Sequence, residues 1–228
     1  MGRGTTRVVS FSGIDGAGKS TQIEALRSHL QAAGHRVCLL TFWDDVACFT
    51  SMRETAGHRF FRGDKGVGSP EKPINRRDKN VRSRTMTLVR WCLYFADAVS
   101  LRLKLRGILR SGVDVVICDR YAWDELANLN LRWWFTRIYV RLIARIAPCP
   151  DVSFLLDADP IQARARKPEY PLDFLYMSRE SYLTLGAIVG NVTVIPPGSV
   201  GEVGAQILSH ISAKKRGASS TDLLARSA

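Results

Sequence analysis

Residues 10–21 read Ser-Phe-Ser-Gly-Ile-Asp-Gly-Ala-Gly-Lys-Ser-Thr, and the part from Gly13 to Ser20 fits the phosphate-loop pattern G-x-x-x-x-G-K-[ST]. An apolar run precedes the pattern and a helical stretch, residues 20–33, follows it, which is the context that such a loop requires. Its glycines allow the backbone to turn tightly, so that successive N–H groups point at a polyphosphate, and the positive end of the helix dipole adds to the attraction. The stretch therefore predicts a P-loop that binds a nucleoside triphosphate.

Individual roles follow from the chemistry of this loop. We expect Lys19 to reach the β- and γ-phosphates and the Ser20 hydroxyl to ligate Mg²⁺. The nucleotide-binding residues predicted here are Gly13, Ile14, Asp15, Gly16, Ala17, Gly18, Lys19, Ser20 and Thr21. A glycine-rich turn between a strand and a helix, without any ligand, is the alternative interpretation of the same residues.

The composition is that of one ordinary globular domain. The chain has 228 residues, of which 46% are hydrophobic and 24% charged, and it is long enough to bury a sizeable core. No apolar run reaches the length of a membrane helix, and the N-terminus lacks the apolar region of a signal peptide. The five cysteines are scattered without a C-x-x-C pair, which argues against a disulfide framework or a zinc site. We therefore expect a cytoplasmic protein.

The net charge of +12 is unusual, and half of it comes from one segment. Residues 59–84 contain nine basic and three acidic side chains, or +6. Such a balance suits anionic ligands and could attract nucleic acid or acidic lipid, although a solvated charged surface explains most of these residues equally well. The glycines and prolines of the same region predict a flexible basic loop over residues 59–80.

Strands and helices alternate along the chain. Apolar strand-like runs lie near residues 8–11, 36–42, 113–118, 151–156 and 192–195, and we expect the run at 36–42 to be buried. Helical stretches cover residues 20–33, 81–110, 126–147, 172–189 and 200–211. The alternation predicts an α/β fold, a P-loop NTPase three-layer sandwich with a five-stranded parallel sheet and helices on both faces. It also predicts one domain, residues 1–212, and a disordered tail, residues 213–228.

Asp119, Arg120 and Tyr121 directly follow the third strand, at the edge of the sheet where the phosphate loop is expected. An Asp at that point can hold Mg²⁺, and an adjacent Arg can neutralise charge on a transferred phosphoryl group. A salt bridge at the strand end is the purely structural alternative. A switch GTPase is disfavoured, because no guanine-reading Asn-Lys-x-Asp segment follows a strand.

Together these segments resemble the thymidylate kinase family. The likeness rests on residues 11–21 and 116–121, on Leu-Tyr-Phe-Ala-Asp at 93–97, on Asp-Ala-Asp-Pro at 157–160 and on residues 173–183. It extends over about residues 7–211. The resemblance implies ATP- and Mg²⁺-dependent transfer of a phosphoryl group to a nucleoside monophosphate, with dTMP foremost, by an enzyme that is often a homodimer.

The resemblance also implies roles for single residues. Asp15 would orient the acceptor phosphate, Asp119 would lie on the magnesium side, and Arg120 would contact phosphate. A short basic lid, residues 163–172, would close over the phosphates, and Tyr94 would stack on the acceptor base unless it merely packs in its helix. The catalytic residues implied are Lys19, Asp15, Asp119, Arg120, Arg164 and Arg166. The substrate-binding residues are Tyr94, Asp97 and Tyr121, and the metal ligands are Ser20 and Asp119.

The acceptor half of the site departs from the family pattern. Ala98 stands where the family usually has an Arg that recognises the base, and Asp44 and Asp45 occupy the ground where it has a Pro and an Arg that grips the acceptor phosphate. The donor half is intact. A kinase of a deoxynucleoside or of another small-molecule hydroxyl, with Asp119 as base, therefore stays open as an alternative.

A basic aromatic segment, residues 131–148, supports more than one interpretation. Arg137, Arg141 and Arg145 recur every four residues and form one stripe, which could contact an anionic membrane or a second subunit. We favour an ordinary helix that covers the sheet. Its inward face would consist of Trp134, Ile138, Leu142 and Ile146. A protein that binds ATP and acts at nucleic acid or membrane through its basic surface is the remaining alternative function.

Overall fold

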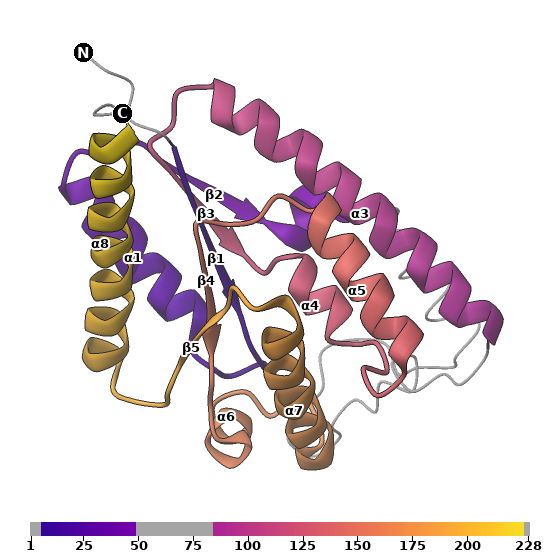
Figure 1. The fold of residues 1–228 in the computed structure, drawn as a ribbon. Coiled ribbons are helices and arrows are strands. Elements are labelled where there is room, and N and C mark those ends of the chain that lie inside the picture. The colour runs from indigo at the N-terminus through magenta and orange to yellow at the C-terminus, as the bar shows by residue number, and fades with distance from the viewer. Residues whose placement is uncertain (1–5, 49–83, 226–228) are drawn as a thin grey trace.

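The structure is a computed structural model that describes the backbone of residues 6–48 and 84–225 and the side chains of residues 6–48 and 87–213. Five parallel strands form one sheet in the order β2-β3-β1-β4-β5 (Figure 1). Their bounds are β1 Arg7–Ser12, β2 Val37–Thr41, β3 Val115–Asp119, β4 Val152–Leu156 and β5 Thr193–Ile195. The predicted α/β sandwich with a five-stranded parallel sheet is confirmed.

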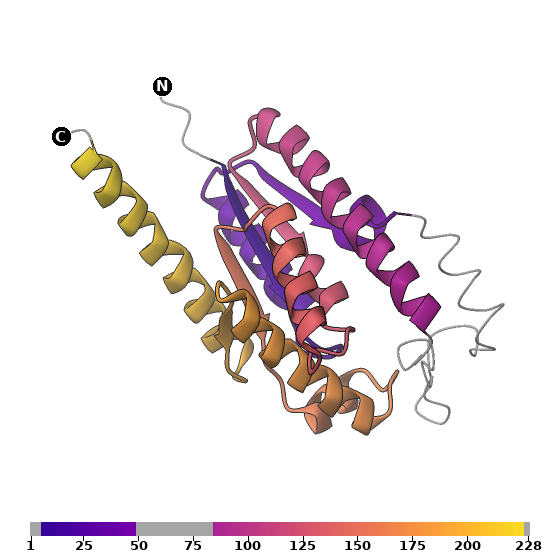
Figure 2. The ribbon, with the colours of Figure 1, turned by 45° about the vertical axis from the view of Figure 1, so that its right-hand side comes forward.

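Helices cover both faces of the sheet (Figures 1 and 2). One face carries α1 (Lys19–Ala32) and α8 (Val200–Ala225), which pack against each other. The other face carries α3 (Arg84–Arg110), α4 (Ala122–Leu126), α5 (Trp134–Ile146) and α7 (Leu172–Val189). A short helix, α6 (Pro160–Arg166), packs against α7, and a π-helical turn, η1 (Phe42–Val46), follows β2.

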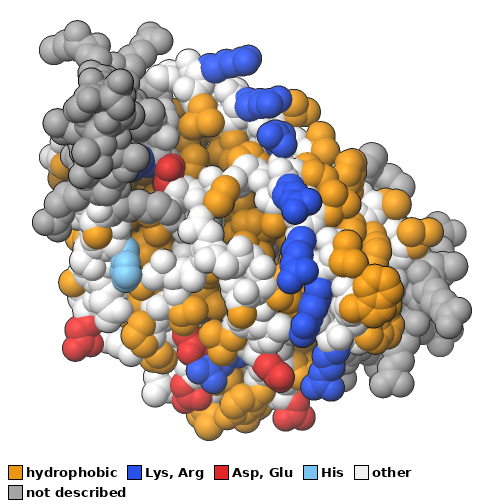
Figure 3. Space-filling model, in the orientation of Figure 1, with side chains coloured by type: hydrophobic (Ala, Val, Ile, Leu, Met, Phe, Trp, Pro, Cys, Tyr) orange, Lys and Arg blue, Asp and Glu red, His pale blue; other side chains and the backbone are white. Residues whose placement is uncertain are grey.

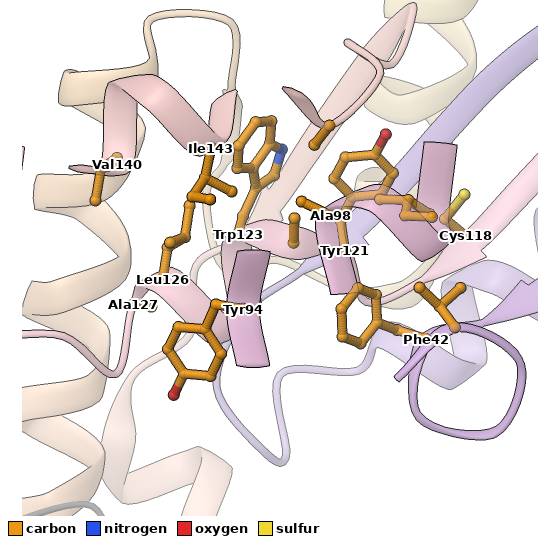
Figure 4. Packing of buried hydrophobic residues seen from close by; sticks show 14 of the residues in the cluster. Phe42, Tyr94, Ala98, Cys118, Tyr121, Trp123, Leu126, Ala127, Val140 and Ile143 are labelled. Atoms are coloured by element: carbon orange, nitrogen blue, oxygen red, sulfur yellow. The ribbon is translucent and has the colours of Figure 1, made fainter. Parts of the chain in front are cut away.

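The central strand β1 divides the core into two layers. Val9 and Phe11 pack with apolar residues of α1 and α8, whereas Val8 packs with those of α3, α4 and α5. This alternation is the two-residue period of a strand that is buried on both faces. Figure 4 shows residues of the largest hydrophobic cluster, in which the rings of Tyr121 and Trp123 lie side by side with their centroids 5.4 Å apart. These layers fix the carboxyl end of β1, where the phosphate loop begins.

The second strand is less buried than the sequence indicated. β2 lies at one edge of the sheet, so only β3 pairs with it, and only Leu40 of its five residues is buried. Leu39, its neighbour, is exposed. The apolar run was misleading because an edge strand receives cover from fewer helices than a central one.

The helix predicted over residues 126–147 is wrong in its bounds and in its inward face. Two helices, α4 and α5, replace it, with a turn at residues 127–133 between them. Trp134 is 72% exposed, Ile138 53% and Leu142 47%, while Tyr139, Val140 and Ile143 face the core. Of the predicted inward residues, Ile146 does pack against the core. The basic aromatic helix therefore presents a mixed apolar and basic face to solvent, which the periodicity alone could not assign.

The remaining boundaries differ in detail. α7 has the bounds that the sequence predicts, whereas α8 continues to Ala225, well beyond residue 211, so that the backbone of most of the predicted disordered tail is helical. α6 was not predicted. The basic loop predicted for residues 59–80 lies outside the described residues.

Candidate functional site

The P-loop connects β1 to α1 at the point where neighbouring strands, β3 and β4, lie on either side of β1. Such a reversal of strand order opens a crevice at the carboxyl ends of the strands. Gly16 has a φ of 82°, and a Cβ added to it would lie 2.2 Å from the carbonyl oxygen of Ala163 in α6. The glycine is therefore required twice, once for its left-handed backbone and once for the close approach of α6. Gly13, Gly16 and Gly18 all have positive φ values, as the tight turn predicted for this loop requires.

Lys19 begins α1 and is buried beneath the loop. Its Nζ donates to the carbonyl oxygens of Gly13, at 2.8 Å, and Ile14, at 2.9 Å. Burial and the positive charge of Arg120 lower the pKa of Lys19 to about 8, although Asp15 opposes this shift. The ammonium group is thus held by loop carbonyls, in a place where the negative charge of a polyphosphate would restore its pKa.

Arg120 connects the strand end to the P-loop. Its Nη2 donates to Oδ1 of Asp15 at 2.6 Å, and its Nη1 donates to Oδ1 of Asp124 at 3.4 Å. Burial alone would lower the pKa of Arg120, but the carboxylates of Asp124 and Asp15 raise it above its ordinary value, so the side chain stays charged. Arg120 also has a φ of 66°, a strained value for a residue with a Cβ.

Asp124 lies under this pair, in the first turn of α4. Its Oδ2 accepts hydrogen bonds from the Ser12 hydroxyl at 2.6 Å and the Tyr121 backbone N–H at 2.9 Å. Its Oδ1 accepts from the Tyr182 hydroxyl of α7 at 2.8 Å. Burial and the charge of Asp124 raise the pKa of Tyr182 well above its usual value, so that this hydroxyl keeps the proton it donates. One carboxylate thus joins β1, α4, α7 and Arg120.

The two predicted lid arginines lie in the last turn of α6. Arg166 Nη1 donates to the carbonyl oxygen of Gly16 at 3.1 Å, which places one lid cation directly on the P-loop. Arg164 is half-buried. The segment that follows, residues 167–171, connects α6 to α7. Of the two, Arg166 therefore lies beside the phosphate loop, whereas the role of Arg164 stays a prediction.

A cleft of about 930 Å³ opens beside Asp15 and Arg120. Its walls come from the P-loop, the start of the described part of α3, the turn at 127–133, α5 and α7. Polar side chains along it include Arg90, Asn128 and Arg137, and Trp91 supplies an aromatic surface. Clefts of this size and mixed lining are typical of small-molecule sites. The phosphate machinery therefore opens onto a space large enough for an acceptor.

The three predicted acceptor-binding residues lie in the core rather than along this cleft. Tyr121 is fully buried and its hydroxyl donates to the carbonyl oxygen of Pro148, which contradicts its predicted role. Asp97 is 1% exposed, and its Oδ1 accepts from the backbone N–H of Cys48 at 2.7 Å. Tyr94 is buried, with its hydroxyl pointing away from the packed cluster in Figure 4, and Trp91, one turn earlier on α3, lines the cleft instead.

The positions that depart from the family pattern also have structural roles. Ala98 is completely buried and lies on the side of α3 that packs against the core. Asp45 accepts a hydrogen bond from the backbone N–H of Thr41 at 2.7 Å and so closes the η1 turn on the end of β2. Asp124, Trp91 and Asn128 were not predicted, because no sequence motif marks them and their places depend on how α3, α4 and the turn at 127–133 pack against one another.

The donor set at the P-loop fits a magnesium nucleotide. Ser20 is exposed in the first turn of α1, and Asp119 ends β3 as the register partner of Phe11 in β1, two residues before Gly13. A hydroxyl and one carboxylate, completed by phosphate oxygens and water, are the oxygen ligands that Mg²⁺ takes in such sites. The exposed hydroxyl and the partly exposed carboxylate are therefore suitable groups to hold it.

Known proteins resemble this chain over most of its length. A thymidylate kinase of Bifidobacterium longum strain DJO10A is 30% identical over 194 residues, which cover 80% of this chain and 85% of that protein. A probable thymidylate kinase of Archaeoglobus fulgidus is 27% identical over 77% of this chain and 80% of its own length. The crystal structure of thymidylate kinase from Ehrlichia chaffeensis superposes with a TM-score of 0.57 at 18% identity, over 91% of this chain and 99% of that one.

The family model for the methylmalonyl-CoA mutase-associated GTPase MeaB matches residues 1–49 only. That segment contains the P-loop, which many nucleotide-binding families share, so this match supports the P-loop alone. The relatives named above match most of the chain. The chain therefore belongs to the thymidylate kinase family of P-loop nucleotide kinases.

Proposed function

We propose that the protein transfers the γ-phosphate of ATP to a nucleoside monophosphate, with dTMP as the preferred acceptor. The observation that carries this proposal is the position of the Asp15–Arg120 ion pair, which joins the P-loop to the end of β3 and lines a cleft of about 930 Å³. Membership of the thymidylate kinase family supports the choice of acceptor. The five free cysteines support the reducing, cytoplasmic setting in which such an enzyme works.

The residues of this chain would divide the work as follows. Lys19 and the loop N–H groups hold the β- and γ-phosphates, and Ser20 and Asp119 hold Mg²⁺, which supplies charge neutralisation when it is bound. Arg120 and Arg166 bring positive charge to the transferred group, where electrostatic stabilisation is most effective. Asp15 orients Arg120 and the acceptor. No covalent nucleophile is needed, since alignment and charge neutralisation carry phosphoryl transfer.

ADP release from ATP and Mg²⁺ tests this proposal across a panel of nucleoside monophosphates, deoxynucleosides and sugars. A Lys19→Ala variant, which lacks the cation held at 2.8 Å from the Gly13 carbonyl, serves as the blank. We expect dTMP to give the highest turnover and Lys19→Ala to abolish it. Higher turnover with a deoxynucleoside or sugar than with every monophosphate would support a kinase activity but refute a nucleoside monophosphate as its acceptor. No release above the blank with any acceptor would refute the kinase.

The exposed face of α3 and α5 supports a proposal about the oligomer. Trp134, Ile138 and Leu142 lie one turn apart on α5, and Leu88 and Leu103 are exposed on α3. Figure 3 shows basic side chains in a row over these two helices, beside hydrophobic ones. Contiguous exposed apolar surface marks an interaction site, and a two-fold contact uses one such face twice. We assign this face to a homodimer, as family membership also suggests.

Light scattering on a sizing column measures this assembly directly. We expect a dimer for the wild type and a monomer for Leu142→Glu, whereas Val200→Glu, an exposed apolar residue at the start of α8 on the other layer, should leave the dimer intact. The same row of arginines also suits anionic lipid, and no helix in the described ranges is long and apolar enough to cross a bilayer. A wild-type monomer that sediments with phosphatidylserine vesicles, but not with phosphatidylcholine vesicles, would assign the face to a membrane surface instead.

A further inference from the structure

We infer that Asp124 is a positioning residue for phosphoryl transfer, because it holds Arg120 in the orientation that reaches Asp15. The inference rests on the proposed kinase function and goes further, since Asp124 lies outside the P-loop and outside the Asp-Arg-Tyr segment at the end of β3. No pattern in the sequence indicates a role for the Asp124 carboxylate. Its role emerges from the four groups that converge on it.

The burial of Asp124 requires compensation. The residue is only 5% exposed. A carboxylate without partners at such a position would lose several kcal/mol of hydration free energy, and buried acids avoid that loss by raising their pKa and becoming neutral. Three hydrogen bonds, from Ser12, Tyr121 and Tyr182, and the ion pair with Arg120 supply that compensation. The site is therefore built to keep a negative charge under Arg120.

Arg120 needs this second anchor. Its backbone is held at a φ of 66°, so the side chain leaves the strand end in a direction that an ordinary strand residue would not take. A guanidinium has donors in a fixed fork, and here Nη2 contacts Asp15 while Nη1 contacts Asp124. With only one carboxylate, the planar group could rotate about the Asp15 contact. Two carboxylates on the fork restrict that rotation.

The two oxygens of Asp124 serve different purposes, which makes the role testable. Oδ2 accepts from Ser12 and from the Tyr121 backbone, contacts that fasten α4 to the sheet. Oδ1 accepts from Arg120 and Tyr182, contacts that face the site. An Asp124→Asn side chain can place its carbonyl oxygen at the first position and its amide at the second. The fold contacts then persist, whereas an amide donor opposes the guanidinium donor of Arg120.

Tyr182 extends the same network to α7, the helix that follows the lid segment. Because its hydroxyl donates to the oxygen that also receives Arg120, a shift of α7 relative to the sheet would disturb the anchor of Arg120. Phe174 and Leu175, at the start of α7, line the acceptor cleft. Asp124 therefore connects the wall of the cleft to the arginine at the phosphate loop.

Steady-state kinetics of Asp124→Asn test the inference. We expect kcat to fall about 10- to 100-fold, the scale on which a small misplacement of a catalytic group acts, while KM for ATP changes less than about 2-fold because the loop contacts of Lys19 are untouched. Glu125→Gln is the matched control, since Glu125 is the next residue on α4, is 4% exposed and loses the same charge. We expect its kcat to equal that of the wild type.

A second comparison separates positioning from stability. In an Arg120→Ala background, Asp124→Asn should lower kcat by less than about 2-fold further, because two residues that act through one contact are not additive. The inference would be overturned if the kcat losses of the two single variants multiplied in the double variant. It would also be overturned if Asp124→Asn had the same kcat as Glu125→Gln. In either case wild-type turnover would still support the kinase. Absence of any wild-type turnover would instead refute the proposed function, and the inference with it.

Discussion

The guanidinium of Arg120 and the carboxylate of Asp15 meet at 2.6 Å, although 105 residues separate them in the sequence. One belongs to the end of β3 and the other to the P-loop after β1, and the parallel pairing of these strands brings their carboxyl ends together. Neither side chain is fully exposed, so the pair is only partly screened by solvent. The contact links the donor machinery to the mouth of the acceptor cleft.

Replacing Arg120 should separate catalysis from nucleotide binding. An Arg120→Lys side chain keeps the charge but lacks the fork that contacts two carboxylates, and loss of one positioned donor commonly costs about 10²- to 10³-fold in kcat. We expect that loss with little change in ATP affinity, measured by turnover and by calorimetry. Arg36→Lys, which removes the fork that contacts Asp114 beyond the opposite end of the sheet, is the control and should leave kcat unchanged.

The lowered pKa of Lys19 predicts proton uptake on nucleotide binding. With a pKa of about 8, part of the Lys19 population is neutral in the free protein at pH 8.5, and phosphate charges would favour its protonated form. Affinity for ATP should therefore fall as the pH rises above about 8. Calorimetry at pH 8.5 in two buffers of different ionisation enthalpy should register uptake, and Lys19→Met should abolish it. Proton release would contradict the prediction.

The close approach of Gly16 to α6 predicts a large cost for a single methyl group. A Gly16→Ala methyl would meet the Ala163 carbonyl oxygen at 2.2 Å, in addition to the strain of a φ of 82°. Gly34→Ala is matched in φ, at 81°, but has open space around its Cβ, so strain alone should cost it about 1 kcal/mol. We expect Gly16→Ala to unfold at a denaturant concentration well below that of Gly34→Ala and to lose ATP binding. Equal unfolding midpoints would contradict the prediction, because they would mean that α6 moves away from the added methyl group without cost.

The orientation of α5 predicts that two of its apolar residues contribute very unequally to the free energy of unfolding. Ile143 is 1% exposed, and Ile143→Ala should lower the free energy of unfolding by about 2–5 kcal/mol. Trp134 is 72% exposed, and Trp134→Ala should change the stability of the monomer by no more than about 0.5 kcal/mol. Urea titrations at low protein concentration compare the two variants. A larger loss of stability for Trp134→Ala than for Ile143→Ala would instead support the inward face that the helical periodicity predicted.

The phosphate half of the site could be predicted from the sequence because its geometry is local. The P-loop is one continuous stretch, and its glycines, Lys19 and Ser20 take their places from a single strand-to-helix turn. The end of β3 could be joined to it because parallel strands end at one edge. Arg120 was therefore expected near phosphate, although its contacts with Asp15 and Asp124 were not.

The acceptor half could not be predicted, because it depends on how separate helices rotate against the sheet. Tyr121 follows Arg120 directly, yet the chain turns into α4 there and buries the ring completely. On α5, both the row of Trp134 and the row of Val140 have helical spacing, and only packing against α3 and α7 decides which row is inside. Sequence periodicity gives the existence of a face but not its direction.

The turn between α4 and α5 separates two kinds of position in the wall of the acceptor cleft. Leu129 and Leu131 are buried and fasten the turn to the core, whereas the residues before, between and after them, Asn128, Asn130 and Arg132, are partly or fully exposed. Natural selection can thus exchange these polar residues while β3 and the Arg120 that follows it stay intact. A lineage with this architecture can change the molecule it phosphorylates and keep the way it handles ATP.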